Sequence, residues 1–117
     1  MRRVSNDSRL ITISWRDIPA QVTARNGRKK TSIQLSDRFQ RAIDKAATRA
    51  GKRTTNEYLG EWRRSEAPCG PDLATAADEA AAELERHFTQ SVLLQYVDND
   101  GFRPDSAGEP PDGGDRG

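Results

Sequence analysis

The sequence of 117 residues has one cysteine, one histidine, few aromatic residues and no long apolar segment. A single cysteine excludes an intrachain disulfide, which makes the cytosol the expected compartment. No window approaches the roughly 18 apolar residues of a membrane-spanning helix, and residues 1–7 lack the apolar core of a secretory signal. We therefore expect a cytoplasmic protein with no membrane-embedded part.

The chain also has little that indicates catalysis. His87 has no partner at metal-ligand spacing, and Cys69 has no nearby histidine or second cysteine that could activate or resolve it. Asp98 begins a run similar to a calcium loop, but Pro104 and the missing third ligand argue against a formed loop. No phosphate-binding loop, dinucleotide fingerprint or nucleophile elbow occurs. We expect a protein that is not an enzyme and has no catalytic residue, metal or cofactor.

Charge is distributed unevenly along the chain. Residues 1–64 hold 16 Lys and Arg against 6 Asp and Glu, whereas residues 65–117 hold 3 against 12. The two parts carry +10 and −9 and nearly cancel to the net charge of +1. Such an asymmetry fits a basic binding surface, an acidic tail that folds over it, or two faces for two partners. It also fits a small domain that uses charge only for solubility.

Alternating apolar residues predict strands in the first part of the chain. Ile11, Ile13 and Trp15 alternate with polar residues, and Pro19 restricts the backbone where this strand ends. Asn26-Gly27 is a strong hairpin signal because a tight turn needs residues that tolerate positive φ. The pattern predicts three antiparallel strands, at about residues 9–16, 20–25 and 29–35.

Helical periodicity follows. One apolar stripe consists of Phe39, Ala42, Ile43, Ala46, Ala47 and Ala50. Thr54 and Glu57 have the spacing of a capping box for a second helix. We predict helices at 37–50, 55–64 and 72–88, and a last short helix that begins after Thr89 or Ser91. The fold class is therefore α+β, a three-stranded antiparallel meander covered by two to four helices.

Three segments resemble one family of bacterial domains. They are the run from Trp15 to Val22 (WRDIPAQV), Gln34 to Phe39 (QLSDRF) and Tyr58 to Arg64 (YLGEWRR). These segments resemble the small bacterial virulence factor domain family, whose domain is also similar to one inside conserved virulence factor C proteins. The resemblance covers about residues 9–88. It implies a compact cytosolic module, often encoded beside folate-dependent one-carbon enzymes of methylenetetrahydrofolate reductase type. No catalytic residues are agreed for this family, so the resemblance assigns none.

The expected organisation is a flexible N-terminus at residues 1–8, a single domain at 9–97, and a disordered acidic tail at 98–117. The tail prediction rests on Pro, Gly and Asp, which leave almost nothing to bury. We expect a non-catalytic accessory protein that binds a larger cytosolic protein through its basic part. The resemblance makes a folate-dependent one-carbon enzyme a natural partner.

The side chains expected to contact this partner are basic or aromatic, because such residues are enriched at interface hot spots. They are Trp15, Arg16, Arg38, Arg41, Lys45, Arg49, Trp62 and Arg63. Core packing is the default role of both tryptophans in so small a domain.

The alternative function is a DNA- or RNA-binding regulator. The third strand and the two helices after it are similar in layout to ribbon-helix-helix repressors, whose paired strands enter the major groove. Lys30, Ser32 and Gln34 would then contact nucleic acid. Against this, the hairpin already provides the third strand with a partner in its own chain, and the loop after Gly51 is long for that motif. An ordinary basic surface is a third interpretation, and the sequence does not predict the oligomeric state.

Overall fold

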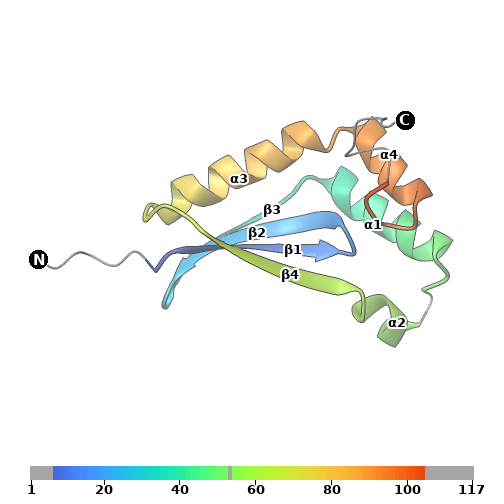
Figure 1. The fold of residues 1–117 in the computed structure, drawn as a ribbon, viewed down its shortest axis with the longest axis horizontal. Helices are drawn as coiled ribbons and strands as arrows, with labels where there is room; N and C mark the ends of the chain where they lie inside the picture. The colour runs from blue at the N-terminus through green and yellow to red at the C-terminus, as the bar shows by residue number, and fades with distance from the viewer. Residues whose placement is uncertain (1–6, 53, 105–117) are drawn as a thin grey trace, which may run out of the picture.

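The first three strands form the predicted antiparallel meander in the computed structural model, which describes residues 7–52 and 54–104 (Figure 1). Strand β1 (Arg9–Trp15) pairs with β2 (Ile18–Asn26), and β2 pairs with β3 (Lys29–Gln34). Gly27 has a φ of +62° in the β2–β3 turn, a conformation that glycine adopts without the strain a Cβ would bring. The α+β fold class is confirmed.

A fourth strand extends the sheet beyond the prediction. Helix α2 (Thr55–Leu59) is shorter than predicted, and the remainder of that segment forms β4 (Trp62–Pro68), which pairs antiparallel with β1. The resulting strand order is β3-β2-β1-β4. Six of the seven β4 residues are exposed, because this edge strand has no covered face. It therefore lacks the apolar alternation by which a strand is recognised in a sequence.

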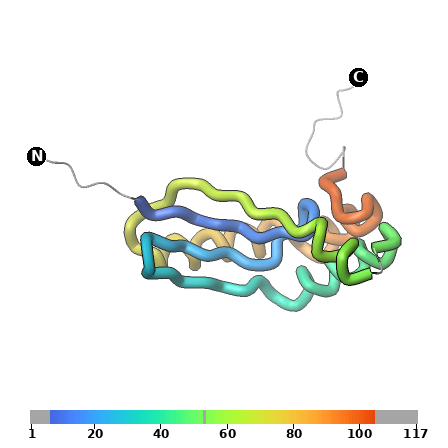
Figure 2. The backbone as a smooth tube through the Cα atoms, turned by 90° about the horizontal axis from the view of Figure 1, so that it is seen from below, coloured from blue at the N-terminus to red at the C-terminus, as the bar shows by residue number. Residues whose placement is uncertain are grey.

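Helix α3 (Leu73–His87) lies over one face of the sheet, whereas α1 (Asp37–Arg49) and α4 (Gln90–Asp98) lie at its end (Figure 1). Helix α3 packs on β2 and β3, while α1 packs on β2 and on α4. Figure 2 shows the opposite face from below, with the strands in front and α3 behind them. The predicted capping box at Thr54 and the predicted cap at Thr89 are both present.

The core lies where α1 and α4 meet the end of the sheet. Its largest fully buried side chains include Trp15, Ile18, Phe39, Ile43 and Leu93. The rings of Phe39, Phe88 and Tyr96 meet edge to face there, and burial raises the pKa of the Tyr96 hydroxyl. The periodic apolar residues of the predicted helices form this core, which is why the α-helical part was predictable.

The folded region extends past both predicted boundaries. Ser8, predicted to be flexible, is buried and accepts a hydrogen bond from the amide of Cys69. Residues 98–104, predicted as disordered tail, pack on the β1–β2 turn, where the amide of Asp17 donates to the carbonyl of Gly101. Few apolar residues make these contacts, so composition did not reveal them. The remaining parts of both predictions, residues 1–6 and 105–117, lie outside the described residues.

Candidate protein-binding surface

Helix α1 has one apolar and one basic face. Its buried residues are Phe39, Ala42, Ile43, Ala46 and Ala47. Four of the predicted partner-binding side chains lie on other faces of the same helix, namely Arg38, Arg41, Lys45 and Arg49. The contacts that each makes within the domain decide which of them remain free to bind.

Two of these arginines are occupied by contacts inside the domain. Arg38 donates from Nε to the carbonyl of Phe88 at 3.0 Å and forms an ion pair with Glu85 at 3.0 Å. Arg49 donates to the carbonyl of Asp98 at 3.2 Å and forms an ion pair with Asp100 at 3.3 Å. Both guanidinium groups tie α1 to the segments around α3 and α4, so their first role is structural.

Arg41 and Lys45 form the free basic part of α1. Neither makes a hydrogen bond or an ion pair with any other residue of the described chain. They border a hollow of about 40 Å³ between α1 and α4. The hollow is lined by Arg38, Arg41, Ala42, Lys45, Gln90, Leu93, Leu94 and Val97. Leu94 is 43% exposed although it is a large apolar residue.

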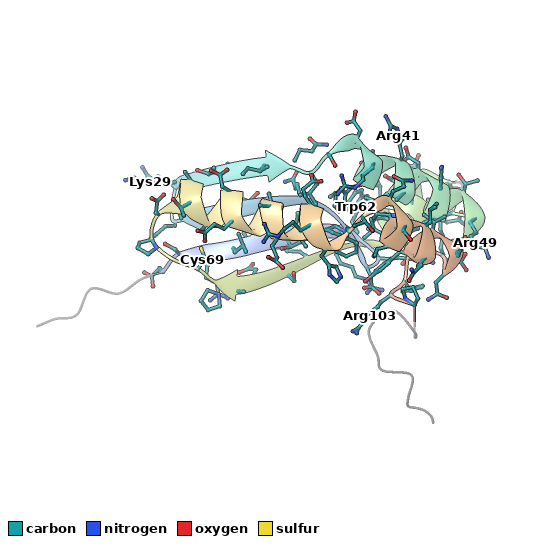
Figure 3. All side chains as sticks on the ribbon, turned by 90° about the horizontal axis from the view of Figure 1, so that it is seen from above. Lys29, Arg41, Arg49, Trp62, Cys69 and Arg103 are labelled. Carbon is teal, nitrogen blue, oxygen red and sulfur yellow. The ribbon has the colours of Figure 1, made fainter. Side chains whose placement is uncertain are left out.

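We call Arg41, Lys45 and Leu94 the helix surface. Its hollow is far smaller than the roughly 300–1,000 Å³ of a small-molecule pocket, so it fits a side chain of a partner protein better than a metabolite. In Figure 3, Arg41 and Arg49 lie at the helical end of the domain, opposite Lys29.

The other predicted partner-binding residues lie around the β1–β2 turn. Trp15 is fully buried and donates from Nε1 to the carbonyl of Tyr58 at 2.9 Å. Its ring stacks on that of Tyr58, which in turn meets Trp62 edge to face. Trp15 is therefore a core residue, and it is not exposed to a partner in this conformation.

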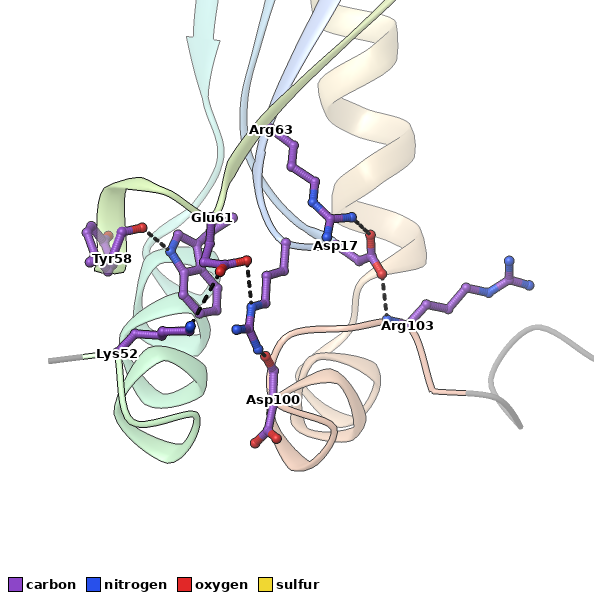
Figure 4. A network of polar contacts seen from close by, with 9 residues as sticks. Asp17, Lys52, Tyr58, Glu61, Arg63, Asp100 and Arg103 are labelled. Carbon is purple, nitrogen blue, oxygen red and sulfur yellow. Dashed lines mark hydrogen bonds and ion pairs between the residues drawn. The ribbon is translucent and has the colours of Figure 1, made fainter. Parts of the chain in front are cut away.

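Arg16 is also buried, with 8% of its surface exposed. It donates from Nε to Glu61 at 3.1 Å and from Nη1 to the carbonyl of Asp100 at 2.8 Å (Figure 4). Its guanidinium lies over the ring of Phe102, 4.4 Å from the centroid. Arg16 thus joins three segments that are far apart in the sequence.

The same network holds Arg63, the one residue of this group that is exposed, whereas Trp62 is partly buried. Arg63 bonds through Nη1 to Asp17 at 3.3 Å, while the amide of Arg103 donates to the other oxygen of Asp17 at 2.8 Å. The sequence groups these aromatic and basic residues by type, but the structure gives them different roles. Trp15 and Arg16 hold the fold, and Arg63 lies on the surface away from Arg41 and Lys45.

Glu61 is a fixed negative charge within this network. The hydrogen bond from Arg16 lowers the pKa of its carboxyl below the ordinary value of 4.5, and the charges of Arg16 and Lys52 act in the same direction against partial burial. Lys52 completes the contact at 3.6 Å. The group is ionised at neutral pH and engaged by two cations, which suits a structural anion rather than a proton donor.

The residues of the nucleic-acid alternative share one face of the sheet. Lys30, Ser32 and Gln34 are exposed on β3, on the side opposite to Thr31 and Ile33, which are partly buried. Ser32 shares a hydrogen bond with Thr23 of β2 at 2.8 Å, which places both hydroxyls on this outer face. The strand pairs with β2 of its own chain, whereas a ribbon-helix-helix protein pairs it with a second chain.

Comparison with known proteins identifies the family. The chain matches the virulence factor family over residues 13–97, from the end of β1 to the end of α4. The chain belongs to the virulence factor family. No similar curated protein and no similar solved structure is found. The helix surface lies inside the matched range of this virulence factor domain, whereas the contacts of residues 98–104 lie beyond it.

Sequence reasoning missed two features of this virulence factor domain. Leu94 falls outside the apolar stripe of α4, whose buried residues are Leu93, Tyr96 and Val97. A large apolar residue outside its stripe is itself a signal of an interaction surface. Phe102 had a comparable signal, an aromatic residue within a polar segment, and it is 37% exposed beside Arg16 and Arg63.

Neither a candidate metal site nor a helix that could cross a membrane occurs among the described residues. Within residues 7–52 and 54–104, no group of three or more His, Cys, Asp or Glu side chains is placed to hold a metal ion. None of the helices in this part of the chain combines the length and apolar character needed to cross a membrane.

Proposed function

We propose that this virulence factor domain is a non-catalytic accessory module that docks on an acidic surface of a larger protein through the helix surface. The observation that carries the proposal is the position of Arg41 and Lys45 beside the exposed Leu94, over a shallow hollow between α1 and α4. An apolar anchor beside free cations is a common composition for a protein-binding patch.

In this proposal the charged residues and the apolar residue of the helix surface affect different steps of binding. Arg41 and Lys45 attract and orient an acidic partner, because complementary charges mainly raise the association rate. Leu94 contacts an apolar side chain of the partner and slows dissociation. The partner surface should therefore present carboxylates around an apolar residue.

The resemblance noted from the sequence indicates which partner to test first. Domains of this kind are often encoded beside folate-dependent one-carbon enzymes of methylenetetrahydrofolate reductase type. We propose such an enzyme, from the same host, as the larger protein. The domain would stabilise or position the enzyme and would contribute no catalytic residue.

A binding experiment with purified proteins tests this proposal. The candidate enzyme is titrated with the wild-type domain, with Arg41→Glu/Lys45→Glu and with Leu94→Ala, and association and dissociation rates are measured. The double variant should lower the association rate about tenfold or more, whereas Leu94→Ala should mainly raise the dissociation rate. Both variants change exposed positions, so circular dichroism should show an unchanged fold.

The matched control is Arg25→Glu/Lys30→Glu, which makes the same change of charge on the open face of the sheet. It should bind the enzyme like the wild-type domain. If the enzyme does not bind the wild-type domain, the choice of partner is wrong. If both double variants lose binding equally, net charge rather than the helix surface is responsible.

A further inference from the structure

The outer face of the sheet has a charge pattern that the proposed function does not use. Every second residue of each strand points to this face, and these residues lie opposite one another on neighbouring strands. The outward side chains that carry charge or amide groups are Arg9, Gln21, Arg25, Lys30, Gln34, Arg64 and Glu66. Helix α3 packs on the other face, and Figure 2 shows the strands of the outer face in front.

Three cations stand side by side across this face. Arg9 is opposite Arg25, and Arg25 is opposite Lys30. Adjacent strands lie only about 4.8 Å apart, and like charges in directly opposite positions destabilise a sheet. The Arg25–Lys30 pair, which no carboxylate of the described residues contacts, points to a ligand that removes the repulsion.

The neighbouring carboxylate neutralises only one end of this row, and Arg25 donates to the carbonyl of Gly27 at 3.1 Å rather than to an anion. Glu66 forms ion pairs with Arg9 at 3.6 Å and with Arg64 at 2.8 Å, so it already serves two arginines. Lys30 has no hydrogen-bond or ion-pair partner among the described residues. In the β2–β3 turn, Arg28 adds an exposed cation near the end of the row, whereas Lys29 is exposed on the side of Thr31.

Among the described residues, this face has no fully exposed apolar or aromatic anchor, because Ile13 and Trp62, which alternate onto it, are both partly buried. Ile11 is buried by its neighbours, and the exposed large apolar residues of the described chain, Leu59, Leu94 and Phe102, lie outside the four strands. A lipid surface or a protein partner would use such anchors for insertion or for the apolar centre of an interface. The aromatic ring of Trp62 is partly buried and packs against Tyr58, so it is a poor platform for stacking on unpaired bases.

From this charge pattern we propose that the outer face of the sheet, centred on Arg9, Arg25 and Lys30, binds the phosphate backbone of double-stranded nucleic acid without sequence preference. Guanidinium and ammonium groups bind phosphate oxygens, and Gln21 and Gln34 add neutral donors beside them. Binding occurs on the face of an intrachain sheet and needs no strand from a second chain. It uses different residues from the helix surface, so it does not depend on the proposed function.

Fluorescence anisotropy with a short mixed-sequence duplex, as DNA and as RNA, tests the inference. With three or four phosphates neutralised, affinity should fall about a hundredfold between about 50 and 200 mM salt. Arg25→Glu/Lys30→Glu should abolish binding at the lower salt concentration, whereas Arg41→Glu/Lys45→Glu should keep the wild-type salt dependence. A second duplex of different sequence should bind equally well.

Each other result overturns the inference. Absence of binding by the wild-type domain at about 50 mM salt, or equal loss in both double variants, shows that this face is not the site. A strong preference for one sequence means that base edges are read, which contradicts binding to the phosphate backbone alone. Tighter binding to vesicles that contain phosphatidylserine would assign the face to a lipid surface instead.

Discussion

Gly101 lies against the indole ring of Trp15. A Cβ at Gly101 would be 2.8 Å from Cζ3 of Trp15, and the residue has a φ of +93°. Glycine is thus required at this position for two reasons, the close approach of the ring and the positive φ of the backbone. The contact is one of those that attach the segment after α4 to the β1–β2 turn.

Replacing Gly101 by alanine should therefore destabilise the domain. The added methyl group forces the ring or the backbone to move, and overpacking of this kind costs roughly 1–3 kcal/mol. The matched control is Gly51→Ala, where φ is +76° but nothing lies within 4 Å of the added Cβ. Urea unfolding should show a larger loss for Gly101→Ala. Equal losses would mean that strain at positive φ is the whole effect and that the ring contact contributes nothing.

The strands and helices with a buried stripe were predictable because burial imposes a period on the sequence. Phe39 and Ile43 mark α1 in this way, and Ile11 and Trp15 mark β1. Strand β4 was missed because it lies at an edge and exposes most of its residues, so Arg63 and Ser65 carry no periodic signal. Its pairing with β1 is a long-range contact, which local patterns do not encode.

The sequence predicted which types of residue form the candidate site, but it did not predict which of them are held by contacts inside the domain. Arg16, Arg38 and Arg41 look alike in the sequence, yet the first bonds to Glu61, the second to Glu85, and the third contacts no polar partner in the described part of the chain. The difference depends on where α3, β4 and the segment after α4 lie in the fold. The same holds for Gly101, whose contact with Trp15 joins distant parts of the chain.

Truncation of the fully buried Trp15 should destabilise the domain more than truncation of the partly exposed Trp62. Trp15→Ala removes a fully buried ring and the hydrogen bond to the Tyr58 carbonyl, and should cost roughly 3–5 kcal/mol. Trp62→Ala removes a partly exposed ring and should cost clearly less. Thermal and urea unfolding followed by circular dichroism measure both values. A Trp15→Ala domain as stable as Trp62→Ala would show that the described core packing is wrong.

Stability should decline in acid partly through Glu61. Its pKa is lowered in the folded state, chiefly by the hydrogen bond from Arg16. The resulting stabilisation is fully present above the ordinary value of 4.5 and is lost as pH falls through the lower folded-state pKa. Urea unfolding of the wild-type domain and of Glu61→Gln across this range should show a steeper acid decline for the wild type. Parallel curves would mean that Glu61 contributes nothing to the pH dependence.

Reversing one charge in the cationic row should stabilise the domain while weakening nucleic-acid binding. Lys30 is opposite Arg25, so Lys30→Glu replaces a repulsive cross-strand pair by an attractive one, worth roughly 0.2–1 kcal/mol. The control is Lys29→Glu, which makes the same change of charge opposite the neutral Asn26 and should leave stability nearly unchanged. Unfolding is measured at low and at high salt, because screening should reduce the gain. A gain in stability together with a loss of duplex binding would show that Lys30 acts in binding rather than in folding, because a variant that bound less through damage to the fold would unfold more easily.

If Lys30→Glu instead destabilises the domain relative to Lys29→Glu, the row is not repulsive, and the argument that it is kept for a phosphate ligand fails.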